Sequence, residues 1–208
     1  MLKLQGIAVS PGVTIGEALV LDTEGFRIPR RFVERSAVDT ELERLKQAVA
    51  ETAREIGRNR DAIRSELGDQ YSAIFDAHLA MLHDERLQGE LTSAVRDKNW
   101  WPEYAVSRTL RRYAKVFQNL DNHIAQRAHD IYDIEKSLLR NLLGQRRETL
   151  AAISQPVIVL AHNLTPSETA NLDRRFVKGF ATELGGPGSH TAIVAEGLEI
   201  PAVVGLGP

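Results

Sequence analysis

A single histidine, His190, stands in a glycine-rich stretch near the end of the chain, directly before a short apolar run. Gly185, Gly186 and Gly188 allow the backbone to fold back tightly, and Ser189 is the residue type that caps a helix start. The free N–H groups of such a helix's first turn attract an anion. Because a histidine with an ordinary pKa of about 6.5 is nucleophilic at neutral pH, it can take and release a phosphoryl group without an activating base. The pattern predicts a phosphoryl carrier at His190, with Thr191 completing the supporting loop.

A second candidate group, Thr169, follows a strong helix-start signal. Residues 165–168 read Thr-Pro-Ser-Glu, which supplies a threonine cap, a proline in the first turn and a glutamate that closes a capping box. Open α/β sheets bind ligands at the carboxyl ends of their strands, so we expect Thr169 and His190 to share one crevice. A threonine near a helix start also commonly bonds its own backbone. For Glu183, two interpretations stay open: it orients His190 or the loop, or it is a solvated carboxylate.

Composition excludes several functional classes. The 208 residues carry 26 basic and 28 acidic side chains, a net charge of −2, so no global charge favours a nucleic acid or a membrane surface. The absence of cysteine excludes disulfides and thiolate chemistry and fits a cytoplasmic location. No spacing of histidine or carboxylate residues indicates a metal site. No targeting segment is evident, and the longest aliphatic run, residues 156–161, is too short to cross a bilayer.

The periodicity of apolar residues divides the chain into three regions. Residues 1 to about 30 have β-like segments at 6–13 and 16–21, which we interpret as two strands joined by a turn. From about residue 36 to 143 the period is helical, with helices expected over 69–83, from Pro102 onward, and up to a stop at Gly144. After residue 148, strands at 157–160, 176–182 and 202–204 alternate with helices.

We therefore expect an α/β lobe built from both chain ends, residues 1–30 and 146–208. The first strands would complete the sheet that begins again near residue 155. An all-α bundle of about four helices, residues 31–145, would be an insertion into this lobe. One basic cluster in the bundle, at helical spacing, is interpreted as a solvated helix face: Arg108, Arg111, Arg112 and Lys115.

Four segments in the right order resemble one known family. They are residues 6–12 (Gly-Ile-Ala-Val-Ser-Pro-Gly), 164–170 (Leu-Thr-Pro-Ser-Glu-Thr-Ala), the loop from Gly185 to Ile193, and 200–205 (Ile-Pro-Ala-Val-Val-Gly). Together they are similar to the N-terminal half of enzyme I of the phosphoenolpyruvate-dependent sugar phosphotransferase system. The resemblance covers almost the whole chain.

The resemblance implies a swivelling phosphohistidine lobe and a function. Enzyme I accepts a phosphoryl group from phosphoenolpyruvate on Nε2 of the histidine that matches His190, and passes it to a histidine of the small carrier protein HPr. A threonine that matches Thr169 hydrogen-bonds nearby, and the helical insertion docks HPr. Phosphoenolpyruvate and Mg²⁺ bind a separate C-terminal domain, which also dimerises. We expect this chain to be a monomeric fragment without a cofactor of its own, able to exchange phosphate with HPr alone.

The candidate HPr contact is an unusually wide apolar stripe on the predicted helix over residues 69–83. Such a stripe suits one face in the bundle core and one in an interface, although it is also compatible with core alone. The candidate contact residues are Asp69, Tyr71, Phe75, His78, Leu79, Leu82 and the more distant Arg127.

The chain departs from the family pattern at three positions. Pro187 and Gly188 replace an arginine and a threonine that commonly precede the Ser-His pair, and Glu196 replaces an arginine. A carboxylate close to the site would repel a phosphoryl group. We expect any compensating positive charge to come from Arg174, Arg175 or Lys178.

Two alternatives stay open. The first is a phosphohistidine lobe of the pyruvate phosphate dikinase or phosphoenolpyruvate synthase type, which phosphoryl exchange with ATP would distinguish. The second is a non-catalytic module that binds a regulator through its helical lobe. Within the enzyme I family, the sugar-transport and nitrogen-regulatory branches are both compatible with the residues.

Overall fold

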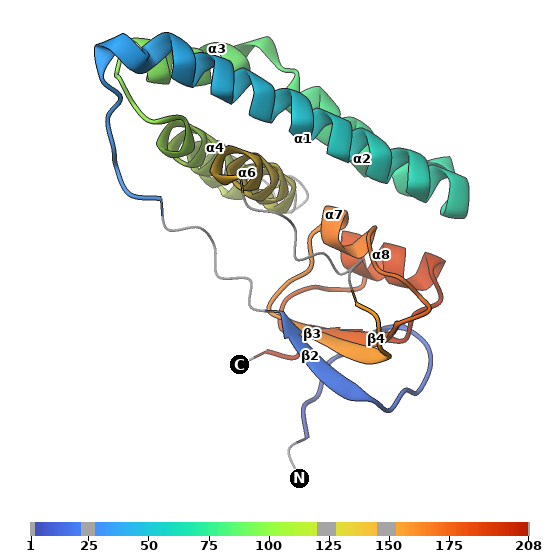
Figure 1. The fold of residues 1–208 in the computed structure, drawn as a ribbon. Coiled ribbons are helices and arrows are strands. Elements are labelled where there is room, and N and C mark those ends of the chain that lie inside the picture. Colours follow the sequence, from blue (N-terminus) through green and yellow to red (C-terminus); the bar gives the residue numbers. More distant parts are fainter. Residues whose placement is uncertain (1–2, 22–27, 120–127, 145–152, 208) are drawn as a thin grey trace. The chain divides into compact units, whose positions relative to one another are not determined.

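A computed structural model describes residues 3–21, 28–119, 128–144 and 153–207 (Figure 1). Their contacts divide the chain into two compact units. The first, here called the sheet unit, comprises residues 1–24, 62–72 and 148–208; the second, the helical unit, comprises residues 25–61 and 73–147. The domain boundaries expected at 30/31 and 145/146 stay predictions, and the second lies outside the described residues.

Within the described residues, the sheet unit contains a five-stranded mixed sheet in the order β1-β5-β4-β3-β2. Strands β2, β3, β4 and β5 run parallel to one another, and β1 pairs antiparallel with β5. The strands are β1 (Ile7–Ser10), β2 (Glu17–Leu21), β3 (Val157–Ala161), β4 (Val177–Thr182) and β5 (Ala202–Val204). This confirms that the first strands complete the sheet formed by the last part of the chain.

The first two strands do not form the hairpin that their proximity in sequence suggested. Strands β1 and β2 lie at opposite edges of the sheet, about 19 Å apart at a strand spacing of about 4.8 Å. Residues 11–16 are long enough to cross that distance, because an extended chain advances about 3.4 Å per residue. Their path is tight: a Cβ on Gly179 would lie 2.5 Å from Cγ2 of Thr14, and one on Gly12 would lie 2.6 Å from Cγ of Pro201. The connection therefore passes closely over β4 and the start of β5.

Two short helices, α7 (Pro166–Thr169) and α8 (His190–Gly197), pack against each other and lie over one face of this sheet (Figure 1). Burying the apolar side of α8 against the strands removes aliphatic surface from water, which is the main force that fixes the helix there. The fully or almost fully buried residues between α8 and the sheet are Val159, Phe180, Ala192, Ala195, Leu198 and Val204.

Long helices form the helical unit and confirm the predicted all-α segment. They are α1 (Val38–Leu67), α2 (Asp69–Leu82), α3 (Glu85–Arg96), α4 (Pro102–Gln118) and α6 (Ala128–Leu143), preceded by the 3₁₀ turn η1 (Arg35–Ala37). The last residues of α1 and the first of α2 belong to the sheet unit by their contacts. Pro102 occupies the first turn of α4 as expected, and Gly144, with φ of 64°, follows the end of α6.

The sequence analysis did not identify α3 as a separate helix. Its start is set by Asp84, whose Oδ1 accepts a hydrogen bond from the N–H of Leu87 at 2.8 Å. Its core side is formed by Leu87, Leu91, Ala94 and Val95, a spacing that is typical of an amphipathic helix.

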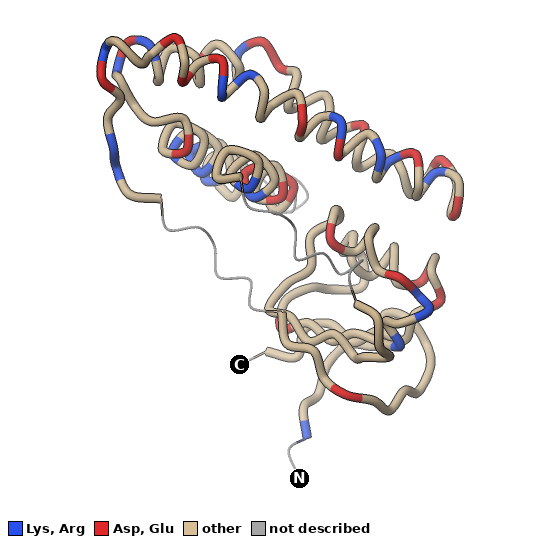
Figure 2. The backbone as a smooth tube through the Cα atoms, viewed as in Figure 1, with Lys and Arg blue, Asp and Glu red and all other residues tan. Residues whose placement is uncertain are grey.

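Polar contacts between distant segments fix the helical unit. The guanidinium of Arg44 on α1 donates to both carboxylate oxygens of Glu103 on α4, at 2.7 and 3.0 Å, and to the carbonyl of Leu142 on α6 at 2.9 Å. Asn141 Nδ2 donates to Thr52 Oγ1 at 2.9 Å. Charges of both signs alternate along α1 (Figure 2), as on a helix with one solvated face. None of the described helices is long and apolar enough to span a membrane.

Candidate functional site

His190 is the first residue of α8 and is partly exposed. The hydroxyl of the preceding Ser189 accepts a hydrogen bond from the N–H of Ala192 at 3.2 Å, which confirms the expected N-cap. The uncapped N–H groups of a first turn point out of the N-terminal end of a helix and carry part of its positive dipole end. An anion attached to the imidazole of His190 would therefore lie next to partial positive charge.

The three glycines of the loop have different roles. Gly185 has φ of 120°, and a Cβ there would lie 3.0 Å from Cβ of Val204 on β5. Backbone conformation and close packing both require glycine at this position. Gly186 and Gly188 have no atom within 4 Å of the position a Cβ would occupy. The loop is thus fixed to the sheet at Gly185 and surrounded by open space just before His190, where a tetrahedral anion needs room.

Thr191 connects the His190 helix to the segment before α7. Its Oγ1 donates to the carbonyl of Leu164 at 2.8 Å, and the residue is 5% exposed. Around α7 the predicted capping box is present: Thr165 Oγ1 accepts from the N–H of Glu168 at 3.2 Å, and a Glu168 carboxylate oxygen accepts from the N–H of Thr165 at 3.0 Å. The loop after β3 and the start of α8 are therefore joined by a side chain that is adjacent to His190.

Thr169 has no exposed surface, and its hydroxyl donates to the carbonyl of Thr165 at 2.8 Å. This is the local backbone contact that threonines near helix starts commonly make. A role for Thr169 beside His190 stays a prediction.

Glu183 contacts a histidine that the sequence analysis did not assign to the site. Its Oε2 lies 2.7 Å from Nδ1 of His162, and both side chains are more than half exposed. His162 follows β3 and Glu183 follows β4, so the pair lies at the carboxyl ends of adjacent parallel strands. Residues 21 positions apart give no local sequence signal of such a contact, and only the strand pairing could have predicted it. Whether Glu183 orients His190 stays a prediction.

The positive charges expected to compensate at the site are mostly engaged elsewhere. Arg175 forms a two-pronged ion pair with Asp173, whose pKa it holds below the ordinary value, and Arg174 Nη2 lies 3.2 Å from Oε2 of Glu199. Glu196 is exposed and six residues after His190 on α8, about 9 Å along the helix axis. A solvated charge about one Debye length away is partly screened at physiological salt, which weakens its repulsion of a phosphoryl group.

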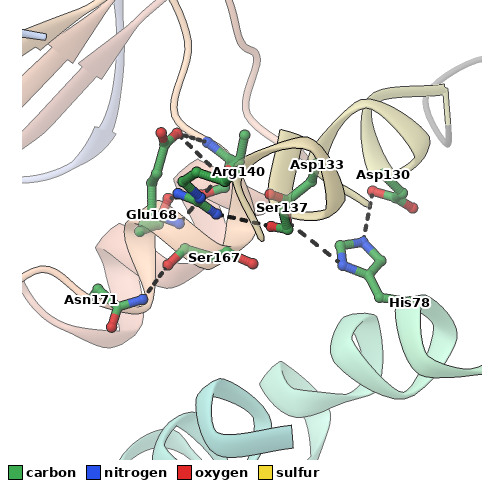
Figure 3. A network of polar contacts seen from close by, with 10 residues as sticks. His78, Asp130, Asp133, Ser137, Arg140, Ser167, Glu168 and Asn171 are labelled. Atoms are coloured by element: carbon green, nitrogen blue, oxygen red, sulfur yellow. Dashed lines mark hydrogen bonds and ion pairs between the residues drawn. The ribbon is translucent and has the colours of Figure 1, made fainter. Parts of the chain in front are cut away.

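The structure corrects part of the predicted partner-binding stripe on α2. Phe75 and His78 are completely buried and Leu82 is 1% exposed. The imidazole of His78 lies between two buried carboxylates of α6, 3.7 Å from Oδ1 of Asp130 and 3.7 Å from Oδ2 of Asp133 (Figure 3). These three α2 residues belong to the core because the wide stripe is mostly internal, and they present no surface for a docked protein.

The remaining stripe residues keep exposed surface. Tyr71 and Leu79 are half-buried, and Asp69 is exposed with Oδ1 2.7 Å from Nε of Arg64. Arg127, the last predicted contact, lies outside the described residues. Among the residues that the structure describes, no group of three or more histidine or acidic side chains is placed to hold a metal ion.

Two family models match the chain. Residues 5–127 match the N-terminal model of PEP-utilising enzymes, and residues 153–208 match the mobile-domain model of PEP-utilising enzymes. The two matches are separated by residues 128–152, and the change from the helical period to the alternation of strands and helices falls within this gap.

Curated relatives and solved structures agree with these matches. The chain is 38% identical to the phosphoenolpyruvate-protein phosphotransferase of Priestia megaterium over 98% of its own length, and 36% identical to that of Bacillus subtilis over 99%. It spans about a third of the length of these relatives, 35% and 36%. A solution structure of an Enzyme I protein matches 99% of this chain and 83% of its own, with a TM-score of 0.78 and 36% identity. A structure described as the N-terminal domain of Enzyme 1 - Nitrogen matches 98% of this chain and 83% of its own, with a TM-score of 0.70 and 28% identity.

Proposed function

Since the chain belongs to the family of PEP-utilising enzymes and matches the N-terminal part of Enzyme I, we propose that His190 carries a phosphoryl group between a donor and the HPr carrier protein. The observation that supports this most is the position of His190: partly exposed, first in a capped helix, and preceded by glycines with open space around them. No other histidine in the described residues begins a helix in this way.

Phosphoryl transfer needs little covalent catalysis by the protein. Nε2 of His190 attacks phosphorus as the bond from phosphorus to the donor breaks, and the reverse displacement passes the group to a histidine of HPr. Positioning and charge stabilisation supply most of the acceleration in phosphoryl transfer. The N-terminal end of α8 supplies partial positive charge, Ser189 fixes the first turn, and Thr191 ties it to Leu164. Thr169 and Glu183 are proposed to support the imidazole of His190 from the carboxyl-end side of the sheet.

The same proposal names HPr as the docking partner and phosphoenolpyruvate as the first phosphoryl donor. The sheet unit carries the phosphohistidine, and the predicted helical domain, residues 31–145, docks HPr, with Asp69, Tyr71 and Leu79 of α2 as contact residues. Phosphoenolpyruvate and Mg²⁺ bind a part of the longer relatives that this chain does not match. The protein acts in the cytoplasm, in either the sugar-transport or the nitrogen-regulatory branch, and the 208-residue chain by itself is a monomer.

Phosphoryl exchange with HPr tests the proposal directly. The chain is incubated with ³²P-phosphorylated HPr, and the label that it acquires is measured before and after acid treatment. We expect an acid-labile, base-stable label that is lost in His190→Ala and retained in the matched control His162→Ala, since His162 is also exposed and belongs to the same unit. No label, or a label that survives His190→Ala, contradicts the proposal.

Docking is tested separately from the chemistry. Leu79→Arg places a bulky charge on the half-buried side of α2 and should raise the HPr concentration needed for half-maximal exchange, with little change at saturation. The control is Ala80→Arg, at an exposed position one residue away. If both variants leave this concentration unchanged, the docking surface lies elsewhere while the role of His190 stands.

A further inference from the structure

The helical unit contains a basic pocket that phosphoryl transfer does not use. It has a volume of about 610 Å³ and lies between α3 and α4, together with the segment that joins them. Its lining contains Lys98, Arg108, Arg111, Arg112 and Lys115, against Glu90 as its acidic residue. The α4 members are the residues at helical spacing that the sequence analysis interpreted as a solvated face. They are exposed, and they also line a concave site.

Two of the basic side chains are neutralised within the protein. Arg112 pairs with Glu90, and Nε of Arg111 lies 2.8 Å from Oε1 of the buried Glu135. Arg108, Lys115 and Lys98 have no carboxylate partner among the described residues, and all three are exposed. The ammonium of Lys98 lies 4.9 Å from the ring centroid of Trp100, which also lines the pocket. The pocket therefore has uncompensated positive charge beside an aromatic wall.

The spacing of the unpaired charges indicates the kind of anion that fits. Arg108 and Lys115 are seven residues apart on α4, which is two turns or about 10 Å along the helix axis. A chain of linked phosphoryl groups is longer than a single phosphate, so it can contact both cations without drawing the two side chains together. The volume lies within the range of small-molecule sites, roughly 300–1,000 Å³, and the guanidinium of arginine is well suited to phosphate oxygens.

From this geometry we propose that the pocket between α3 and α4 binds a small polyphosphate, such as the phosphoryl chain of a nucleotide, with Arg108 and Lys115 at its two ends. Trp100 and Ala94 add apolar surface to the lining beside these cations. The site belongs to the helical unit alone and is independent of His190.

Calorimetric titration of the 208-residue chain tests this inference, with metal-free ATP, inorganic tripolyphosphate and adenosine as probes. We expect ATP and tripolyphosphate to bind, with affinity that falls as salt rises, and adenosine not to bind. The double variant Arg108→Gln/Lys115→Gln should lose about tenfold or more in affinity. Lys46→Gln/Arg96→Gln, at exposed positions outside the lining, removes the same charge and should bind like the unaltered chain.

Three outcomes overturn the inference. They are failure of both polyphosphates to bind at millimolar concentration, equal loss of affinity in the two double variants, and binding of adenosine without tripolyphosphate. Because all four positions are exposed, unaltered circular dichroism and melting temperature should accompany every titration, so that a change in affinity is not a change in folding.

Discussion

The hydroxyl of Thr191 donates to the carbonyl of Leu164 at 2.8 Å, and this contact joins the start of the His190 helix to the loop after β3. Thr191 and Leu164 are almost fully buried, so the loss of the Thr191 hydroxyl removes a hydrogen bond from the buried carbonyl of Leu164. Thr191→Val should lower the free energy of unfolding by about 1–3 kcal/mol and slow phosphoryl exchange, because His190 is the adjacent residue. Urea denaturation and exchange with phosphorylated HPr measure the two effects. Thr191→Ser keeps the hydroxyl and should recover most of both, and a serine variant as impaired as valine would contradict this explanation.

Gly185 and Gly188 form a matched pair for testing the loop. Gly185→Ala introduces a Cβ at φ of 120° and 3.0 Å from Val204 Cβ, and should cost about 1–3 kcal/mol of stability. Gly188→Ala meets no atom within 4 Å and should change stability by less than about 0.5 kcal/mol. Urea midpoints of the two variants provide the comparison. Equal midpoints would show that the contact of Gly185 with β5 does not fix the loop.

Burial raises the pKa of Glu135 above its ordinary value, although hydrogen bonding to Ser107 and the charge of Arg111 act in the opposite direction. When the pKa of a carboxyl group is higher in the folded state than in the unfolded state, the group contributes stability at a pH below its unfolded-state pKa. This contribution is lost as pH rises through its folded-state pKa. Glu135→Gln stays neutral, so its unfolding free energy should rise relative to the unaltered chain between about pH 4 and pH 7.

The matched control for this pH dependence is Glu51→Gln. Hydrogen bonding and charge from Arg54 lower the pKa of the exposed Glu51, so this variant should lose stability relative to the unaltered chain as pH rises, the opposite direction. Thermal melting from about pH 7 down to about pH 3 measures both differences, because the change at Glu51 falls below the ordinary glutamate pKa of about 4.3. The same sign for the two variants would contradict the assignment of burial as the dominant effect at Glu135.

His78, enclosed by Asp130 and Asp133, should be important for the stability of the helical unit. His78→Ala removes a fully buried ring that lies beside two buried carboxylates and leaves a cavity in its place, a change expected to cost about 3 kcal/mol or more. The control His83→Ala, at an exposed position directly after the end of α2, should cost less than about 0.5 kcal/mol. If the two variants unfold at the same urea concentration, the buried cluster contributes little.

Local patterns in the sequence predicted the features that depend on neighbouring residues. The capping box at Thr165, the cap at Ser189 and the stop at Gly144 are set within a few residues, and all three are present. The order of strands is different, because alternating apolar residues specify that a strand forms but not which strand it pairs with. The separation of β1 from β2 and the contact of Glu183 with His162 both follow from that non-local pairing.

The α2 stripe shows a second limit of sequence patterns. Apolar periodicity identified Phe75, His78 and Leu82 as one face of a helix, but not whether that face is internal or external. Tertiary packing decides this, and it buries all three. In the same way, the spacing of Arg108, Arg111, Arg112 and Lys115 identified a common helix face, whereas the pocket depends on α3 and Trp100.

Locating the phosphate on the imidazole tests the central claim most directly. The ¹⁵N-labelled chain is phosphorylated by phosphorylated HPr, and the nitrogen spectra of its six histidines are recorded before and after. The account predicts a coupling between ³¹P and ¹⁵N at Nε2 of His190 and unchanged spectra for the other histidines. A coupling at a different histidine, or at Nδ1 of His190, would contradict it.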